Sequence, residues 1–447
     1  MRAVSHAAEV AVAGRWRRWL WLGWGCPVPS PCSSSSSCCL RPCCAVPARG
    51  GCPPRPPTVP ERTVPPPPPG RGSTRRRSRR RGPGGTKRSS TASPTGCWSP
   101  PSSNGKYLAS CADDRTVRLW STRDFAAREH HCLRANMGLD HAELIRFSPD
   151  SRAFVVWLAS SETIRVYKMT KKDDGNFTFT AAAGDFPKKH KAPIINIGVA
   201  ETGKFIMTAS NDTTIMIWSP KGEVLASINT NQMSNAYATV SPCGRFVASC
   251  GFTPDVKVWE VCFGKNGDFR EVARAFELKG HAAGIHSFSF SNDSRRMATL
   301  SKDGTWKFWD TDVEYKKQQD PYLLLTGKCE VAEPCRIALS PNAHVVAISS
   351  GADIVVYNTR RGEEEERFIG VHGQCITDLA FDTSSRYLVS CGDRAIRVFH
   401  NTAGHRAVVE EMEAILRKTG NKATRERLEQ QISSARQALA AIYGKKH

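Results

Sequence analysis

One segment of the chain carries the residue types of a phosphate-binding loop. From Gly198 to Lys204 a glycine, four intervening residues and a Gly-Lys pair follow the spacing that cradles nucleotide phosphates. In that motif a Ser or Thr after the lysine binds Mg²⁺, and a helix follows. Here Phe205 follows the lysine, and the next residues are apolar and strand-like. We therefore expect no nucleotide site at this position.

A second segment has the side chains of a metal site without the spacing. Glu129-His130-His131-Cys132 offers four adjacent donors, but a zinc site needs three or four ligands that converge from separated positions. No second spaced pair accompanies them, so a surface loop is the preferred interpretation. The sequence also offers no convergent acid, base and nucleophile. We therefore predict no catalytic residue, no metal, no cofactor and no small-molecule substrate.

The remaining candidate functional residues are lysines, and their role would be to bind a partner. They gather around the second and third units of an internal repeat, at Lys168, Lys171, Lys172, Lys188, Lys189 and Lys191. Such a group binds an acidic protein partner or RNA phosphate, whereas lysines in loops are often simply solvated. Both interpretations stay open, and these six lysines are the candidate partner-binding residues.

Histidine, aspartate and tryptophan recur in that repeat from about residue 100 onward. The clearest copy, residues 280–310, matches the G-H…W-D signature of repeats of about 40–45 residues. Within it, Asp303 lies in a tight turn between two apolar strands. We predict that His281, Asp303, Trp309 and a strand hydroxyl such as Ser301 form a buried polar network. Its role is expected to be structural.

Six further copies align with this one. Each closes a strand with an aromatic residue: Trp120, Tyr167, Trp218, Trp259, Trp309, Tyr357 and Phe399. Each places an acidic residue a few positions earlier: Asp114, Glu162, Asp212, Asp255, Asp303, Asp353 and Asp393. We predict that these residues, too, are structural. A single four-stranded blade cannot cover both its faces, so such repeats stack around an axis. The predicted fold is therefore all-β, a seven-bladed β-propeller.

The signature is similar to that of the WD-repeat family, and in particular the chain resembles transducin beta-like WD-repeat proteins. The strings that carry the resemblance are residues 104–109, 185–193 and 252–260. The resemblance runs from about residue 102 to the C-terminus. It implies a non-catalytic WD-repeat scaffold associated with the endoplasmic reticulum, whose protein partner is a stress-response kinase of the unfolded-protein response. Such proteins carry a hydrophobic anchor, where this chain has a Pro-, Arg- and Cys-rich segment.

The sequence divides into three parts. Residues 1–101 hold 17 Lys and Arg against two acidic residues, and this Pro-rich composition predicts a disordered basic tail. Residues 102–401 contain the WD-repeat propeller, and residues 402–447 have the apolar spacing of a helical C-terminal tail. The apolar run at residues 19–24 is far shorter than the roughly 20 residues of a membrane span. No membrane anchor is therefore evident.

Closure of the ring is expected to be incomplete. Propellers of this kind usually borrow a strand from residues just before the first repeat. Residues 86–101 have no alternating apolar pattern, and Pro94, Pro100 and Pro101 lack backbone donors. We therefore expect two uncovered strand edges, which the C-terminal helices are the segments best placed to cover.

Two further functions remain open beside the scaffold. Residues 118–123 and 355–360 resemble degenerate forms of the W-D-x-R end found in substrate receptors of cullin ubiquitin ligases. The arginine run at residues 75–81 makes the basic tail a candidate RNA-binding element. The cysteines follow no regular spacing, which favours a reducing, cytosol-facing location.

Overall fold

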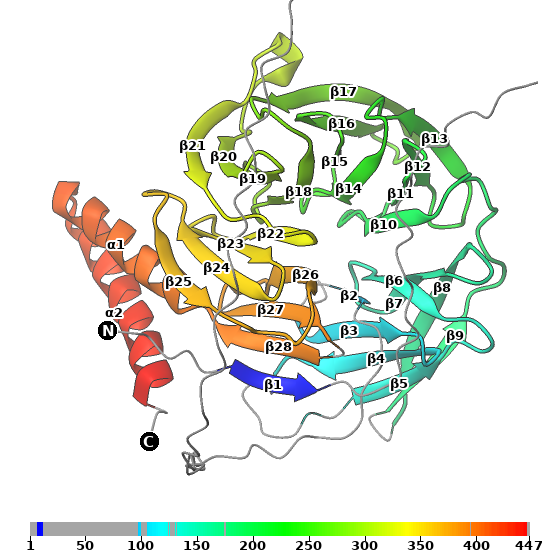
Figure 1. Cartoon of the computed structure of the whole chain (residues 1–447), viewed down its shortest axis with the longest axis horizontal. Coiled ribbons are helices and arrows are strands. Elements are labelled where there is room, and N and C mark those ends of the chain that lie inside the picture. Colours follow the sequence, from blue (N-terminus) through cyan, green and yellow to red (C-terminus); the bar gives the residue numbers. More distant parts are fainter. Residues whose placement is uncertain are drawn as a thin grey trace, which may run out of the picture. The chain divides into compact units, whose positions relative to one another are not determined.

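Short apolar strands separated by tight turns assemble into seven four-stranded antiparallel sheets in the computed structural model. The structure describes residues 7–11, 97–99, 105–123, 125, 130, 132–173, 176–393 and 395–444, which belong to one unit of the chain. The predicted seven-bladed propeller is confirmed (Figure 1).

Each of the first three blades is built from four consecutive strands. Blade 1 contains β2 (Cys97–Ser99), β3 (Tyr107–Ala112), β4 (Thr116–Ser121) and β5 (Cys132–Asn136). Blade 2 contains β6 (Ala142–Phe147), β7 (Ala153–Leu158), β8 (Thr163–Lys171) and β9 (Phe177–Ala181). Blade 3 contains β10 (Ile194–Val199), β11 (Ile206–Ser210), β12 (Thr214–Trp218) and β13 (Val224–Asn229).

Blades 4 to 6 follow the same plan. Blade 4 contains β14 (Asn235–Val240), β15 (Phe246–Gly251), β16 (Asp255–Phe263) and β17 (Phe269–Lys279). Blade 5 contains β18 (Ile285–Phe290), β19 (Arg296–Ser301), β20 (Thr305–Asp310) and β21 (Tyr322–Lys328), with the 3-10 turn η1 (Tyr315–Lys317) before β21. Blade 6 contains β22 (Cys335–Leu339), β23 (Val345–Ser350), β24 (Asp353–Asn358) and β25 (Glu364–Phe368).

Blade 7 is assembled from both ends of the chain, and here the structure differs from the expectation. It contains β26 (Ile376–Phe381), β27 (Tyr387–Gly392), β28 (Ala395–His400) and, as its outer strand, β1 (Ala7–Ala11). β1 pairs antiparallel with β28, with Ala7 opposite Phe399. The segment Ala7–Ala11 contains no proline, so each of its residues has the backbone donor that Pro94, Pro100 and Pro101 lack. The expectation that the helices would cover this edge was therefore wrong.

The inner side of blade 1 is also formed. β2, which lies within the range predicted as tail, pairs with β3. It contacts β6 of blade 2 and β26 of blade 7, so the innermost strands form a continuous circle. A buried apolar cluster fills each of the seven blade-to-blade interfaces, including Leu108, Trp120 and Val389 between blades 1 and 7. The ring is therefore closed.

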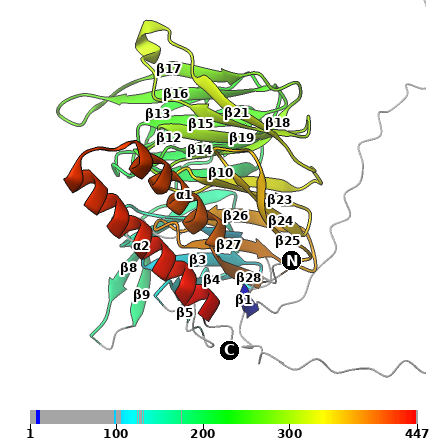
Figure 2. The same ribbon diagram turned by 90° about the vertical axis from the view of Figure 1, so that its left-hand side faces the viewer.

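The predicted helical tail is confirmed as two helices beside blade 6, α1 (Thr402–Lys418) and α2 (Lys422–Gly444) (Figure 2). The side chain of Asn401 caps α1 by accepting a hydrogen bond from the Gly404 backbone at 2.9 Å. Ala403 and Ala407 of α1 pack into the core between blades 6 and 7, and α2 packs on α1. Neither helix, nor any other in the described residues, is long and apolar enough to cross a membrane.

Strand direction determines which loops share a face. Successive strands alternate in direction, so the loops joining one blade to the next lie at the same end as the turns between the second and third strands. We call this end the inter-blade face; its loops are residues 137–141, 182–193, 230–234, 280–284, 329–334 and 369–375, and its turns follow β3, β7, β11, β15, β19, β23 and β27. The opposite end, with the other turns, is the hairpin face.

Candidate functional site

In blade 5 four side chains form a chain of hydrogen bonds from an inter-blade loop across two strands. The indole N–H of Trp309 on β20 donates to Thr299 Oγ1 on β19 at 3.0 Å. Thr299 Oγ1 lies 2.8 Å from His281 Nε2, and His281 Nδ1 lies 3.1 Å from Asp303 Oδ2. The predicted network of His281, Asp303 and Trp309 therefore forms. Its hydroxyl is Thr299, whereas Ser301 donates to the carbonyls of residues 283 and 284.

The donor and acceptor roles along this series of hydrogen bonds follow from the groups at its two ends. A carboxylate only accepts, so His281 donates through Nδ1 to Asp303, accepts at Nε2 from Thr299, and is neutral. Burial lowers the pKa of His281, although the bond to Asp303 opposes that shift. Burial alone would raise the pKa of Asp303, but hydrogen bonds from Thr305, Ala282 and His281 outweigh it and lower that pKa to about 2. The network therefore holds a neutral imidazole beside an ionised carboxylate.

Blade 3 repeats this arrangement, with the Thr214 hydroxyl between the histidine and the carboxylate. The indole of Trp218 donates to Thr208 Oγ1 at 2.8 Å, and Thr208 lies 2.7 Å from Nε2 of His190. His190 Nδ1 is 2.9 Å from Thr214 Oγ1, which donates in turn to Asp212.

Blade 7 lacks only the indole. His372 lies 2.8 Å from Ser390 Oγ and 2.7 Å from Asp393, while Phe399 stands in place of the tryptophan. The roles of His190 and His372 escaped the sequence analysis. Their signal is spacing, because His190 precedes Trp218 by the same number of residues as His281 precedes Trp309.

These hydroxyl–histidine–carboxylate sets have the connectivity of a hydrolase triad, so their accessibility decides what they can do. The triad mechanism requires the hydroxyl oxygen to reach a substrate carbonyl. The three hydroxyl residues Thr208, Thr299 and Ser390 are each 0% exposed. The sets therefore fasten an inter-blade loop to the strands of its blade and offer no reachable nucleophile.

Two other blades hold variants of the network. In blade 1 the indole of Trp120 donates to Ser110 at 2.9 Å, and Asp114 pairs with buried Arg118 at 3.1 Å instead of a histidine. In blade 4 the fully buried Gln232 occupies the loop position, with its amide oxygen accepting from Ser249 at 2.8 Å. Trp259 is buried in the core between blades 3 and 4.

The two segments with chemical motifs are placed as follows. Gly198 lies within strand β10, and residues 201–204 form the turn to β11, so the segment from Gly198 to Lys204 has strand geometry rather than that of a loop before a helix. Glu129 and His131 lie outside the described residues. Among the residues that the structure describes, no cluster of three or more His, Cys, Asp or Glu could hold a metal.

The six candidate lysines do not form one cluster. Lys168, Lys171 and Lys172 lie toward the hairpin face, near the β8–β9 turn, whereas Lys188, Lys189 and Lys191 lie in the loop between β9 and β10 on the inter-blade face. β8 has nine residues, so its ends are roughly 26 Å apart at a rise of about 3.3 Å per residue. The two groups therefore lie on opposite faces of the ring.

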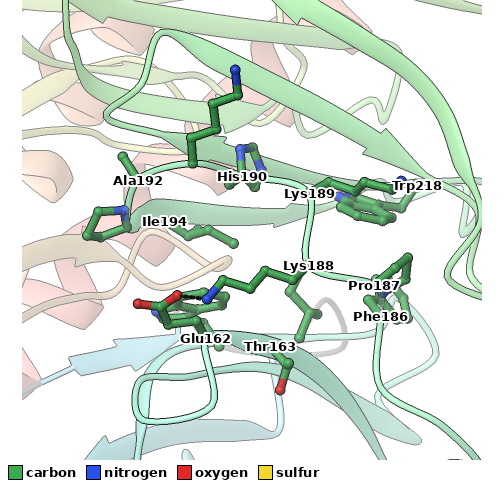
Figure 3. A pocket seen from close by; sticks show the side chains of 14 residues that line it. Glu162, Thr163, Phe186, Pro187, Lys188, Lys189, His190, Ala192, Ile194 and Trp218 are labelled. Atoms are coloured by element: carbon green, nitrogen blue, oxygen red, sulfur yellow. Dashed lines mark ion pairs between the residues drawn. The ribbon is translucent and has the colours of Figure 1, made fainter.

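The β9–β10 loop is held at several points. Lys188 forms an ion pair with Glu162 (Figure 3). Asp185 accepts a two-pronged bond from Arg165 at 2.5 and 2.6 Å. The small pocket beneath this loop has a volume of ≈ 70 Å³. Ligand pockets usually measure about 300–1,000 Å³, so the fixed loop presents its outer surface rather than a cavity.

Apolar side chains distinguish the inter-blade face. Among the described residues, the four most exposed large apolar side chains are Leu139 (89%), Ile369 (78%), Met233 (75%) and Phe252 (64%). Leu139, Met233 and Ile369 lie in inter-blade loops, and Phe252 lies in the turn after β15. Leu139 lies between blades 1 and 2 and Ile369 between blades 6 and 7, whereas Met233 and Phe252 lie on adjacent segments of blades 3 and 4. Adjoining exposed apolar residues are typical of protein-binding surfaces.

These features define the class of protein. The WD domain, G-beta repeat family matches residues 89–121, 186–219, 273–310 and 364–400, and each matched segment contains the three inner strands of one blade. The chain is thus a WD-repeat β-propeller, whose architecture is that of a non-catalytic protein-interaction scaffold.

Comparison with curated proteins narrows the family. Transducin beta-like protein 2 of Mus musculus is 69% identical over 343 residues, which cover 76% of this chain and 78% of that protein. The Homo sapiens protein of that name is also 69% identical, over 76% of this chain and 77% of its own length. Pre-mRNA-processing factor 19 homolog 2 of Arabidopsis thaliana is 24% identical over 60% of this chain and 48% of its own length. The chain belongs to the transducin beta-like protein 2 family.

Proposed function

We propose that this chain is a protein-interaction scaffold at the cytosolic surface of the endoplasmic reticulum, and that a stress-response kinase is among its partners. Membership of the transducin beta-like protein 2 family supports this assignment. The observation that carries the binding role is that the four most exposed large apolar side chains described, Leu139, Ile369, Met233 and Phe252, all lie on the inter-blade face. Burying such side chains against a partner contributes roughly 25 cal/mol per Å² of apolar surface.

The blade networks support the same role. A scaffold gains affinity when its binding loops are already ordered, because less conformational entropy is lost on association. His190 and His281 fasten the loops of residues 182–193 and 280–284, and His372 fastens the loop of residues 369–375. The inter-blade face is therefore expected to bind without large rearrangement.

Proximity labelling in cells tests the proposal. The full chain fused to a biotin ligase is expected to label a stress-response kinase and other proteins of the endoplasmic reticulum membrane. Predominant labelling of a cullin adaptor would instead support a ubiquitin-ligase substrate receptor. Recovery of RNA that is lost at higher salt would support an RNA-binding function of the basic residues 75–81, which lie outside the described residues. Either of these results without the kinase would contradict the proposal.

A further inference from the structure

Met233 and Phe252 form an apolar pair on the inter-blade face over blades 3 and 4. Met233 is 75% exposed and Phe252 is 64% exposed, although both side chains are large and apolar. The two segments are adjacent, because the Phe252 backbone N–H donates to the carbonyl of Ser234, the residue after Met233. Two neighbouring apolar side chains in water are a favourable anchor point for a partner.

The loop that carries Met233 is held in a conformation that its sequence does not favour. Asn231 and Met233 adopt positive φ angles of 51° and 60°. For a residue other than glycine such a conformation costs about 1 kcal/mol or more. The exposed Met233 side chain gains no burial that would offset this cost. Folding alone therefore leaves this cost uncompensated, and burial of the Met233 side chain against a partner would offset it.

Buried groups beneath the loop fix this conformation. The Gln232 side chain is fully buried and donates to the carbonyls of Ser249 and Asp255, each at 3.2 Å. Lys257 donates through Nζ to the carbonyl of Thr230 at 2.9 Å. The Met233 side chain thus projects from a loop whose neighbouring residues are tied to blade 4.

Positive charge borders the pair along a continuous path of the same face. The Thr230 N–H donates to the Thr213 carbonyl, and the preceding Asp212 accepts from the Lys191 backbone at 2.9 Å. Lys189 and Lys191 are exposed, and their ammonium groups form no ion pair within the described residues. The nearby acidic groups are already occupied, since Asp212 also accepts from Thr214, and Glu162 pairs with Lys188. The apolar pair and the two lysines therefore lie on loops that backbone hydrogen bonds connect across blade 3.

We propose that Met233, Phe252, Lys189 and Lys191 form a docking site for an extended acidic peptide segment of a partner protein that carries one bulky apolar residue. The apolar residue packs between Met233 and Phe252, and Asp or Glu side chains meet the two lysines. Single-stranded RNA fits this site less well, because it binds to successive aromatic platforms, and Phe252 is one aromatic side chain beside a methionine. This inference rests on the proposed scaffold function and names the chemistry of one partner.

Peptide selection tests the proposal with an unbiased probe. A displayed library of random 12-residue peptides is selected against the full chain, and an enriched peptide is then measured by fluorescence anisotropy. We expect enriched sequences to combine Asp or Glu with one bulky apolar residue. Met233→Gly combined with Phe252→Ser is expected to weaken binding at least about tenfold. Because glycine accepts the positive φ at position 233, this variant should keep its melting temperature.

The charge component has its own variant and control. Lys189→Glu combined with Lys191→Glu is expected to weaken binding at least about tenfold and to remove most of its salt dependence. Matched controls are Leu323→Ser with Leu324→Ser on β21, the outer strand of blade 5, and Lys221→Glu with Lys265→Glu in turns of the hairpin face. Both control pairs are expected to change affinity less than about twofold.

Several outcomes would overturn the docking site. They are failure to enrich any peptide, enrichment of neutral or basic peptides, and binding that the Met233 and Lys189 variant pairs leave unchanged. Displacement of the peptide by a uridine 12-mer RNA would assign the surface to nucleic acid instead. Proximity labelling separates the two proposals, because a wild-type chain that labels the kinase in cells would keep the scaffold function even if this docking site failed.

Discussion

Trp309 contributes to the fold in two separable ways. Its ring is 3% exposed in the core between blades 4 and 5, and its N–H begins the hydrogen-bond chain to Asp303. We expect Trp309→Ala to lower the free energy of unfolding by roughly 3–5 kcal/mol, because the substitution opens a cavity and removes a buried donor. Urea denaturation followed by circular dichroism would measure this change.

Trp309→Phe is the matched control for that substitution. It keeps most of the ring and removes the N–H, so a loss of only about 1 kcal/mol is expected. Blade 7 already carries Phe399 at the equivalent position. Equal losses for the two variants would show that the hydrogen bond, rather than the packing, dominates.

The buried histidines make stability depend on pH. Burial lowers the pKa of His190, His281 and His372 below the ordinary value of 6.5. Each is then neutral in the folded state and takes up a proton more readily when unfolded. Stability is therefore complete above about pH 6.5 and falls as the pH drops below it, by up to about 1.4 kcal/mol per pH unit for each histidine. Urea midpoints measured from pH 7.5 to 5.0 would test this slope.

The titration of Asp303 should not contribute to the pH dependence of stability between pH 7.5 and 5.0. Its pKa is lowered to about 2, so the stability that it provides is lost only as the pH falls through the acid range below 3.8. His281→Gln should consequently reduce the slope of unfolding free energy against pH between pH 7 and 5, while His190 and His372 continue to contribute. An unchanged slope in this variant would mean that His281 is not titrating as described.

The residue types of the networks could be predicted from the sequence, but the hydroxyl could not be chosen by type alone. Ser301 and Thr299 lie on the same strand and the same side of it, and both are suitable donors. The register of β19 against β20 places Thr299 within reach of the indole. The same separation of ten residues joins Trp120 to Ser110 and Trp218 to Thr208. This spacing becomes informative only once the strand pairing is known.

Among the secondary-structure elements, the sequence analysis missed β2 (Cys97–Ser99), which lies within the predicted tail, and above all β1. Its five residues are Ala-Ala-Glu-Val-Ala, a pattern too short and too weakly β-forming to separate from the rest of the first hundred residues. The repeat signals could fix blades 2 to 6 because each holds all four strands in one continuous segment. Blade 7 is completed by a partner far away in sequence, for which local periodicity carries no information.

The pairing of β1 predicts how the edge of blade 7 behaves. We expect deletion of residues 1–11 to reduce hydrogen-exchange protection in β28 at least about tenfold, because Ala395–His400 would lose the hydrogen bonds on its outer side. Protection in β20 of blade 5 is the internal reference and should change little. Equal protection of β28 with and without residues 1–11 would remove β1 from the ring.

At the scale of the whole molecule, three asparagines can report on which side of a membrane the propeller lies. Asn176, Asn211 and Asn292 each begin an Asn-X-Ser/Thr sequence, and all three are exposed. A propeller that entered the lumen would present three accessible glycosylation sites. If the chain lies on the cytosolic side, as proposed, we expect it to show no mass shift on glycosidase treatment. A glycosidase-sensitive shift would contradict the proposed location.

The closure of blade 7 has a consequence for the order of events during synthesis. β1 leaves the ribosome before its partner β28, which follows roughly 385 residues later in the chain. At about 5–20 residues per second, the first strand waits about 20–80 s for its partner. Blades 2 to 6 can form while the chain is still growing, since each is made of neighbouring strands. The ring itself can be sealed only after β28 has emerged, so any nascent chain released before residue 395 carries a permanently unmatched first strand.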